Sequence, residues 1–419
     1  MPGLPRTAWL EIDLDALAAN LTVLRHLAGG GVRVEPVVKA DAYGHGAVPV
    51  ARTLEGAGAD GLAVASFDEA IVLRRGGVRV RILVLFPVPP EHAARAAREG
   101  IALTAGDPVL LDRLLGAFAA AREAGESGGR SLHLEVEVET GLGRGGFAMP
   151  GLLDAVRRIR AEAGVTLDGV WSHLTAPDDD ARTRAQRRVF DAALSRLADA
   201  GSAARRSHLA ASGGILAGLT TYEAVRPGLA TYGLVPDEMA HGPAAHGEAG
   251  RLRPALSLLA RPVRVADLPA GTGISYGPSF ETRRPSRIAT LPLGYGDGWP
   301  RARSNRAEAL VRGRRVPLVG TVAMDAVMAD VTDVPGPPVS VDDEFTLIGE
   351  EGGDRINAHD VAQGGDTISW EVVTAMSRRL PRVYHAAAGV AGLRTLADGE
   401  TAWHPTSTRP ATSPRSRQR

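Results

Sequence analysis

The chain has 419 residues, and its 48 basic and 48 acidic side chains leave a formal net charge of zero. This balance argues against a nucleic-acid-binding protein, because neutralising phosphates requires an excess of basic residues. Hydrophobic residues make up 44% of the chain, which excludes a disordered protein, and the absence of cysteine excludes disulfides and thiolate metal sites. The sequence contains no run of about 20 apolar residues, so no membrane span is predicted. No signal-peptide core follows Met1, so we expect a cytoplasmic protein.

Short β-rich runs alternate with helical patterns over roughly the first 240 residues. The first run, Trp9–Asp13, precedes a helix over Leu14–Leu27, in which leucines recur at helical spacing. About eight such units predict a parallel (β/α)8 barrel, in which the catalytic residues lie at the C-terminal ends of the strands. Further strands are predicted at Val34–Val38, Gly61–Ala65, Val80–Leu85, Ile101–Thr104, Ser131–Val138, Val165–Trp171, Ser207–Ala210 and Ala224–Pro227, and helices at Phe67–Arg75, Glu91–Glu99, Pro108–Glu123, Pro150–Ala163 and Asp180–Ala200.

The barrel is expected to occupy residues 1–245, because Asp237–Gly250 has the composition of a linker and helical periodicity mostly disappears beyond it. Residues 246–395 are predicted to form a mainly antiparallel β-domain with one helix, at about Ser369–Arg379. Residues 396–419 are predicted to be a disordered tail. The strands predicted for the β-domain are Val263–Ala266, Arg287–Leu293, Val316–Val319, Ala326–Val331 and Glu344–Ile348.

Lys39 is the only lysine; the other 47 basic residues are arginine. Arginine can replace lysine where only charge is needed, but it cannot lose a proton and attack a carbonyl. Lys39 directly follows the predicted strand Val34–Val38, which places it at a catalytic strand end. Lys39 is therefore a candidate for covalent catalysis.

The segment around Lys39, Val37-Val38-Lys39-Ala40-Asp41-Ala42-Tyr43-Gly44-His45-Gly46, resembles the pyridoxal-phosphate signature of the alanine racemase family. A lysine amine can form an imine with the cofactor's aldehyde, and the glycines allow close approach. The resemblance extends from about Trp9 to Tyr384. Further matching motifs occur in family order: Glu139–Phe147, Trp171–His173, His208–Ser212, Val225–Gly228, Ile274–Gly277, Gly294–Gly298 and Met324–Asp325.

The resemblance implies an enzyme that interconverts L- and D-alanine by two-base proton transfer at Cα, with pyridoxal 5'-phosphate as cofactor. Lys39 and Tyr276 would be the two acid/base groups on opposite faces of the substrate. The further residues implied for cofactor binding are Tyr43, Ser212, Gly228, Leu229 and Trp370 around the phosphate, Arg226 at the pyridine nitrogen, His173 between Arg226 and Tyr276, and Arg144. The residues implied for the small amino-acid substrate are Arg144, Tyr295 and Met324, and His208 would support the site.

The family's head-to-tail homodimer is a second implication, with Tyr276, Tyr295 and Met324 reaching the barrel of the partner. The resemblance also implies a role in supplying D-alanine for peptidoglycan. We expect no nucleic acid or membrane among the partners. We expect no catalytic metal either, because His45, His173 and His208 lie on separate segments without ligand spacing.

The sequence departs from the family pattern around the site. Glu137 stands where the family often has a carbamylated lysine, and its carboxylate is predicted to orient Arg144 by a charged hydrogen bond. Trp370 replaces a tyrosine, Thr321 an arginine and Ala211 an asparagine. These changes leave serine or a broader range of amino acids open as alternative substrates.

Other function classes also stay open. Gly141-Leu142-Gly143-Arg144-Gly145-Gly146 satisfies the G-x-G-x-x-G pattern of an NAD-dependent oxidoreductase, although the predicted helix starts too late for that motif. A non-catalytic pyridoxal-phosphate-binding protein could use a similar barrel, but the β-domain argues for an enzyme. Decarboxylation or aldol cleavage on the same scaffold is a further alternative.

Overall fold

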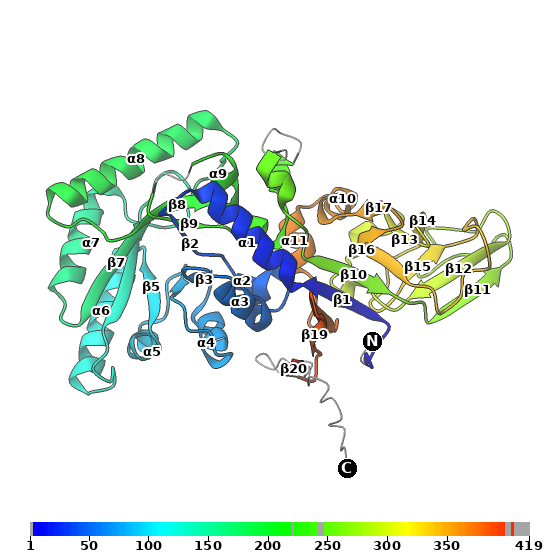
Figure 1. The fold of residues 1–419 in the computed structure, drawn as a ribbon, viewed down its shortest axis with the longest axis horizontal. Coiled ribbons are helices and arrows are strands. Elements are labelled where there is room, and N and C mark those ends of the chain that lie inside the picture. Colours follow the sequence, from blue (N-terminus) through cyan, green and yellow to red (C-terminus); the bar gives the residue numbers. More distant parts are fainter. Residues whose placement is uncertain (1–2, 220–221, 241–246, 399–403, 406–419) are drawn as a thin grey trace, which may run out of the picture.

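The computed structural model describes residues 3–219, 222–240, 247–398 and 404–405, which form a barrel domain and a second, β-rich domain (Figure 1). Part of the predicted linker Asp237–Gly250 and most of the predicted tail 396–419 lie outside the described residues. No helix in the described residues is both long and apolar enough to cross a bilayer.

The barrel is a sheet of eight parallel strands. It closes beyond β2, where the amide of Val38 donates to the carbonyl of Ala63 at 2.8 Å and the amide of Ala63 donates to Pro36 at 2.9 Å. The predicted (β/α)8 barrel is therefore confirmed. Its strands, in spatial order, are β2 (Arg33–Val34), β9 (Ala224–Arg226), β8 (Ser207–Ala211), β7 (Val165–Trp171), β6 (Leu132–Glu137), β5 (Ile101–Ala105), β4 (Ile82–Val84) and β3 (Leu62–Val64).

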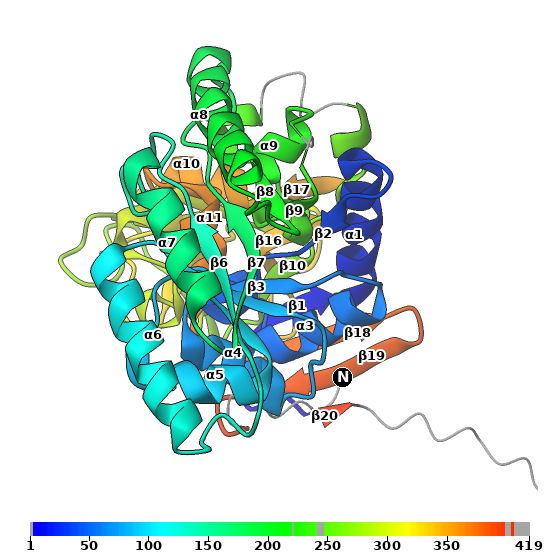
Figure 2. The same cartoon turned by 90° about the vertical axis from the view of Figure 1, so that its left-hand side faces the viewer.

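Most of the predicted barrel helices start within one residue of the predicted position, but the helix predicted from Glu91 starts at Ala93, and the helices Ala47–Gly56 and Ser212–Leu216 were not predicted. The side chain of Asp13 caps α1 by accepting a hydrogen bond from the amide of Ala16, and Asp107 caps α6 in the same way through Leu110. Figure 2 shows α6 and α7 on one side of the barrel and α1 on the other. The helices are α1 (Leu14–Ala28), α3 (Ala47–Gly56), α4 (Phe67–Arg75), α5 (Ala93–Glu99), α6 (Pro108–Glu123), α7 (Met149–Ala161), α8 (Asp180–Asp199) and α9 (Ser212–Leu216), with the short α2 (Lys39–Tyr43) described below.

The first predicted strand does not belong to the barrel. It forms β1 (Ala8–Asp13), which pairs antiparallel with β10 (Leu256–Ala260) and parallel with β18 (Arg382–Ala386) in the second sheet (Figure 1). Alternating apolar residues identify a strand but not its partners, which here lie more than two hundred residues away along the chain. The barrel nevertheless has eight strands because β2–β9 supply all of them.

The second sheet has twelve strands, and every described pairing in it is antiparallel except that of β1 with β18, as predicted for a mainly antiparallel domain. Two helices pack beside it, α10 (Ala358–Gly364), which the sequence did not predict, and α11 (Ser369–Thr374), which is shorter than predicted. The other strands are β11 (Arg264–Leu268), β12 (Ser286–Leu291), β13 (Ala307–Val311), β14 (Arg314–Val319), β15 (Val327–Asp330), β16 (Phe345–Glu351), β17 (Asp354–Ile356), β19 (Gly389–Arg394) and β20 (His404–Pro405).

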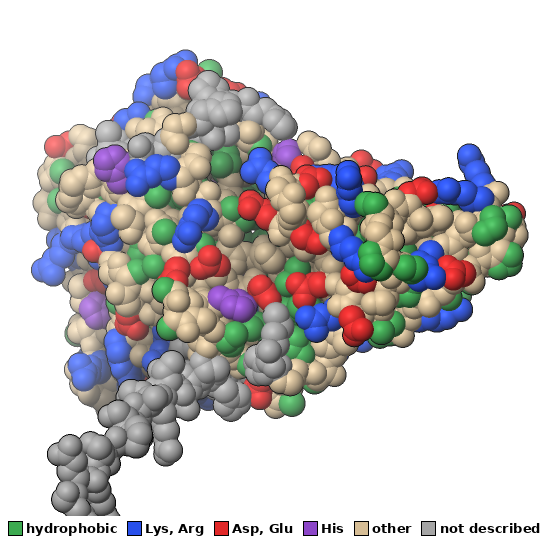
Figure 3. All heavy atoms as spheres, turned by 45° about the vertical axis from the view of Figure 1, so that its right-hand side comes forward, with side chains coloured by type: hydrophobic (Ala, Val, Ile, Leu, Met, Phe, Trp, Pro, Cys, Tyr) green, Lys and Arg blue, Asp and Glu red, His purple; other side chains and the backbone are tan. Residues whose placement is uncertain are grey.

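Short 3-10 turns connect these elements at Pro90–His92, Leu229–Tyr232, Asp237–Met239, Gly247–Arg251, Tyr295–Asp297 and Arg301–Arg303. One apolar core runs through both domains, with Leu10 of β1 and Leu258 of β10 in the same cluster as the barrel residues. On the face drawn in Figure 3, acidic and basic side chains are interspersed, in keeping with the zero net charge.

Candidate active site

A cavity of about 440 Å³ lies at the C-terminal ends of the barrel strands. Its lining comes from the ends of β2, β4, β6, β7, β8 and β9 and the segments that follow them, and from α11 of the second domain. Nine residues predicted for the site line this one cavity: Lys39, Tyr43, Arg144, His173, Ser212, Arg226, Gly228, Leu229 and Trp370.

Lys39 opens an unusual turn. The next four residues, none of them glycine, have φ angles of 53°, 55°, 55° and 51°, which is the left-handed region that such residues rarely adopt. The carboxylate of Asp41 holds this turn by accepting two hydrogen bonds of 2.9 Å from Arg394 and one of 2.8 Å from the amide of Ala47. The guanidinium of Arg382 donates to the carbonyl of Gly44 at 2.9 Å. Both arginines belong to the second domain, which therefore fixes the lysine-bearing turn of the barrel.

The environment favours a neutral Lys39. Burial lowers the pKa of its amine, and the positive charge of Arg144 lowers it further, against a smaller opposing effect of Glu69. A neutral amine is the form that attacks a carbonyl carbon. The only lysine of the chain is thus both placed and tuned for covalent chemistry.

The next part of the cavity fits an anion. The hydroxyl of Ser212 accepts hydrogen bonds from the amides of Gly228 at 2.9 Å and Ala230 at 3.1 Å. A Cβ on residue 228 would lie 2.6 Å from the phenol oxygen of Tyr43 and would displace it, whereas glycine leaves the phenol in place. Burial raises the pKa of Tyr43, which keeps the phenol a neutral donor. Because the hydroxyl of Ser212 accepts from these two amides, its own proton is left to donate. The two hydroxyls of Ser212 and Tyr43 are donors suited to a phosphate group.

Arg226 is buried beside this anion-binding region. Its guanidinium donates to the carbonyl of Ser172 at 2.7 Å and to Nδ1 of His208, and it lies 4.9 Å from the ring centroid of Trp171. Burial lowers its pKa to about 10, so Arg226 remains a cation near neutral pH. It can donate a hydrogen bond to a ring nitrogen but does not give up a proton.

Arg144 faces Glu137 across 3.6 Å between Nη2 and Oε1, and its guanidinium lies 5.4 Å from the ring centroid of Phe86. Burial raises the pKa of Glu137, while the charge of Arg144 opposes that rise. Burial lowers the pKa of His173 to about 3, with Arg226 as the next cause, so its imidazole is neutral here.

Trp370 reaches the cavity from α11. The carboxylate of Asp237 fixes the start of this helix by accepting hydrogen bonds from the amide and the hydroxyl of Ser369 at 2.7 and 2.6 Å. Ala211 also lines the cavity, whereas Thr321 does not. Instead, the carbonyl of Thr321 accepts a hydrogen bond of 2.6 Å from Ser275 in the second domain.

Tyr276, Tyr295 and Met324 lie outside the cavity, and their exposed fractions are 73%, 42% and 52%. They belong to one group of loops in the second domain. The amide of Tyr295 donates to Ala323 at 3.1 Å, and the amide of Gly296 donates to Met324 at 2.9 Å. Tyr276 follows Ser275, which is bonded to the same segment through Thr321. The structure therefore gathers these three residues on an exposed surface, away from Lys39 of the same chain.

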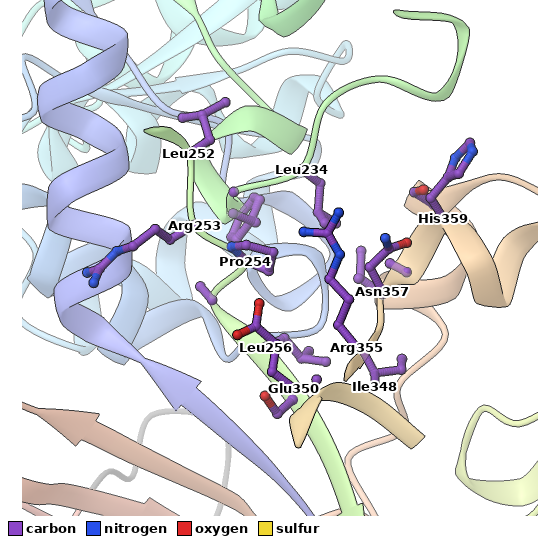
Figure 4. Close-up of a pocket in the computed structure, with 18 of the residues that line it drawn as sticks. Leu234, Leu252, Arg253, Pro254, Leu256, Ile348, Glu350, Arg355, Asn357 and His359 are labelled. Atoms are coloured by element: carbon purple, nitrogen blue, oxygen red, sulfur yellow. The ribbon is translucent and has the colours of Figure 1, made fainter. Parts of the chain in front are cut away.

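A second cavity, of about 910 Å³, lies between the two domains (Figure 4). Figure 4 shows Arg355 extending from the second domain toward Leu234 of the barrel. Ser369 and Val373 of α11 line this cavity, while Trp370 and Thr374 of the same helix line the smaller one. None of the predicted site residues lines the larger cavity.

Sequence reasoning missed Glu135, which lies two residues before Glu137 on β6 and is fully buried. Two acidic residues spaced by two on a buried strand share one face, and this pattern could have identified Glu135 as an interior charge. It also missed the partners of Asp41, because Arg394 lies on the last long strand of the chain. Among the described residues, no group of three or more His, Asp or Glu side chains gathers as potential metal ligands.

Comparison with known proteins extends over nearly the whole chain. Residues 12–236 match the family model of the alanine racemase N-terminal domain, and residues 255–384 match that of the C-terminal domain. The chain is 41% identical to the alanine racemase of Symbiobacterium thermophilum, over 90% of this chain and 97% of that protein. It is 38% identical to alanine racemase 2 of Caldanaerobacter subterraneus, over 90% and 95%.

Solved structures agree with these matches. The crystal structure of alanine racemase from Bacillus anthracis with bound L-Ala-P superposes with a TM-score of 0.85 at 34% identity, covering 94% of this chain and 98% of that one. The alanine racemase from Streptomyces lavendulae gives a TM-score of 0.82 at 34% identity, covering 92% and 98%.

Proposed function

Since the chain belongs to the alanine racemase family and is an enzyme that interconverts L- and D-alanine, we propose that Lys39 and Tyr276 exchange protons with opposite faces of the substrate's Cα. The observation that carries this assignment is the position of Lys39. The only lysine lies at a barrel strand end, has a lowered pKa, and borders a cavity with a built anion site.

The residues of the cavity fit pyridoxal 5'-phosphate. The hydroxyls of Tyr43 and Ser212 and the amide of Leu229 would hold its phosphate, and the amide of Gly228 would join them by exchanging the hydroxyl of Ser212, its present acceptor, for a phosphate oxygen. The amine of Lys39 would attach to the aldehyde carbon of the cofactor. When bound, this cofactor accepts electron density from the Cα of an attached amino acid and so makes the Cα proton removable.

Arg226 and Arg144 would orient the reacting groups. The guanidinium of Arg226 would donate a hydrogen bond toward the ring nitrogen without transferring a proton, which limits how much negative charge moves away from Cα. Reprotonation at Cα is then favoured. Arg144, with the amide of Met324 and the side chain of Tyr295, would hold the substrate carboxylate, and Trp370 would border the phosphate and the substrate.

A second copy of the chain would complete the site. Tyr276 is 73% exposed and lies outside the cavity that contains Lys39, so it needs another molecule to reach a substrate. We therefore propose a homodimer in which the loops bearing Tyr276, Tyr295 and Met324 cover the cavity of the partner. His173 would then lie next to the incoming phenol.

Borohydride trapping tests the assignment of Lys39. Reduction of the holoenzyme followed by peptide mass spectrometry should find a pyridoxyl group on the peptide containing Lys39. The test is unusually clear because the N-terminal amine is the only other primary amine in the sequence. Lys39→Ala and the charge-preserving Lys39→Arg should both lose the adduct and the racemisation of L-alanine, since guanidinium remains protonated. An adduct elsewhere, or an active Lys39→Arg enzyme, would reject the proposal.

The substitutions at Trp370 and Ala211 border the cavity, so they bear on the size of substrate that it accepts. Alanine is the substrate that the family indicates. Comparing turnover of alanine, serine and larger amino acids would measure the effect of these substitutions. A cytoplasmic location and a role in supplying D-alanine for peptidoglycan stay predictions.

A further inference from the structure

A line of ionisable side chains crosses the barrel interior from the cavity toward the opposite end. Arg226 donates to Nδ1 of His208, and Nε2 of His208 lies 2.6 Å from Oε2 of Glu135. Oε1 of Glu135 accepts a hydrogen bond of 2.6 Å from Arg81, whose other nitrogen lies 3.7 Å from Glu35. The side chains of His208, Glu135 and Glu35 are fully buried.

These contacts determine where His208 carries its proton. A guanidinium can only donate hydrogen bonds, so Nδ1 of His208 must accept from Arg226 and cannot itself bear a proton. A carboxylate can only accept, so Nε2 must donate to Glu135. The two neighbours therefore select one neutral tautomer of His208, with its proton on Nε2.

We propose that Glu135 is a positioning residue that holds His208 in the Nε2–H tautomer and thereby keeps the guanidinium of Arg226 turned toward the cofactor cavity. This inference rests on the proposed role of Arg226. It concerns a residue that contacts neither cofactor nor substrate and acts through the imidazole between them.

The charges of the network agree with a neutral His208. Three guanidinium groups face three carboxylates, because Arg206 pairs with Glu35 at 2.5 Å and Asp168 lies 3.6 Å from Arg81. Burial lowers the pKa of His208, and Arg226 lowers it further, against the opposing charge of Glu135. Although burial raises the pKa of Glu135, Arg81, His208 and Arg206 together outweigh this effect and lower the pKa, so the carboxyl stays ionised. A proton on Nδ1 would point directly at an N–H of Arg226.

Removal of the Glu135 carboxylate should weaken the preference of His208 for the Nε2–H tautomer. In Glu135→Leu nothing accepts from Nε2, so only the hydrogen bond from Arg226 still favours this tautomer. A fraction of the protein can then carry the proton on Nδ1, where it pushes the guanidinium of Arg226 away. In Glu135→Gln the amide oxygen can still accept from Nε2, so this variant should keep the wild-type tautomer at least in part. Glu35→Gln is the matched control, because it removes a buried carboxylate of the same network that does not touch His208.

The direct test is the tautomer of His208 in the full-length holoenzyme. Nitrogen NMR of histidine-labelled protein, with the signal assigned by its loss in His208→Asn, distinguishes a protonated from an unprotonated ring nitrogen. We expect a protonated Nε2 and an unprotonated Nδ1 in the wild type and in Glu35→Gln. In Glu135→Leu we expect part of the signal to come from a protonated Nδ1.

A second measurement links the tautomer to function. Glu135→Leu should shift the absorption of the bound cofactor and lower kcat for alanine by about 10- to 100-fold, by analogy with the loss of the partner that orients a metal-bound histidine. Glu135→Gln should restore most of both quantities, and Glu35→Gln should resemble the wild type. If Glu135→Leu does not fold, Glu135→Gln decides. A wild-type tautomer of His208 together with a wild-type cofactor spectrum in Glu135→Gln supports the inference. A wild-type cofactor spectrum in Glu135→Gln with Nδ1 of His208 protonated overturns it.

The inference is overturned if wild-type Nδ1 is protonated, if Glu135→Leu keeps the tautomer and spectrum of the wild type, or if Glu35→Gln changes both equally. A failure of the proposed function is a different result. In that case the wild-type enzyme does not trap a pyridoxyl group at Lys39 or does not racemise alanine, whatever the tautomer of His208.

Discussion

At the scale of single residues, the site depends on what each side-chain type can do with a proton. Lys39 can lose one, and burial lowers the pKa that controls this loss. Arg226 and Arg144 cannot, so they serve as fixed donors and charges. Composition made this division visible, because an arginine-rich sequence with one lysine has a single side-chain amine available for imine chemistry.

Glu137 provides a prediction at this scale. Its Oε1 lies 3.6 Å from Arg144, and the proposed role of Arg144 is to hold the substrate carboxylate. Glu137→Gln should raise KM for alanine by roughly 10-fold, because one charge-assisted interaction that orients Arg144 is lost. The change in kcat should be smaller. Steady-state kinetics measure both constants, with Glu123→Gln on the exposed end of α6 as the control. Kinetics of Glu137→Gln equal to those of the wild type would contradict this role.

At the scale of elements, the segment from Lys39 to Gly46 is built from distant supports. Its left-handed turn is held by Asp41 and by the arginines of β18 and β19. Two glycines allow other elements to approach closely. A Cβ on Gly44 would lie 2.1 Å from the carbonyl of Val373, and one on Gly46 would lie 2.0 Å from the phenol oxygen of Tyr384. The local sequence therefore permits the turn, while the second domain stabilises it.

The stability of this element should depend on pH through His45. Its Nδ1 donates to the carbonyl of Tyr43 at 2.9 Å, and its ring lies 4.5 Å from that of Tyr232. Burial lowers the pKa of His45 from 6.5 to about 4. The unfolded chain therefore binds a proton that the folded protein excludes. The stabilisation is complete above pH 6.5 and is lost as the pH falls toward 4, by on the order of 3 kcal/mol.

Urea unfolding at a fixed protein concentration checks this expectation. The free energy of unfolding of the wild type should fall more steeply below pH 6.5 than that of His45→Gln. His26→Gln, which changes an exposed histidine of α1, should follow the wild type. Equal slopes for wild type and His45→Gln would show that His45 is not held neutral in the folded protein.

At the scale of the whole molecule, the second domain acts in two directions. Inward, Arg382 and Arg394 support the turn that bears Lys39 of their own chain. Outward, the domain presents Tyr276, which is 73% exposed and lies outside the cavity that contains that lysine. Strand β1 links the two domains, because it pairs within the second sheet and leads directly into α1 of the barrel. A single chain therefore contains both residues that we propose to exchange protons with the substrate, without bringing them together.

Mixing two inactive variants tests whether sites are shared between subunits. Lys39→Ala and Tyr276→Phe should each be inactive alone. A dimer formed from one subunit of each has one site with both wild-type residues and one site with neither. Random exchange of equal amounts should therefore restore about a quarter of wild-type activity. Mixing Lys39→Ala with Lys39→Arg is the control and should remain inactive. No recovery despite proven subunit exchange would show that Tyr276 does not act in trans.

The sequence by itself determined the element types and most of the cavity. Apolar periodicity predicts the barrel helices and strands because each element must present one face to a core, and the order of strands and helices predicts parallel pairing. Strand ends in a parallel barrel converge, so residues that follow β2, β6, β7, β8 and β9 meet without further information.

Only the tertiary structure decided the partners that are distant in the chain. Three contacts depend on how the domains pack and how the barrel closes. They are the pairing of β1 with β10 and β18, the hydrogen bonds from Arg394 to Asp41, and the contact of Glu135 with His208. Local sequence specifies which face of an element is buried, but it does not specify what lies across that face. The exposure of Tyr276 could not be predicted for the same reason, because the local sequence around a tyrosine at a turn does not show whether it packs inward or faces another molecule.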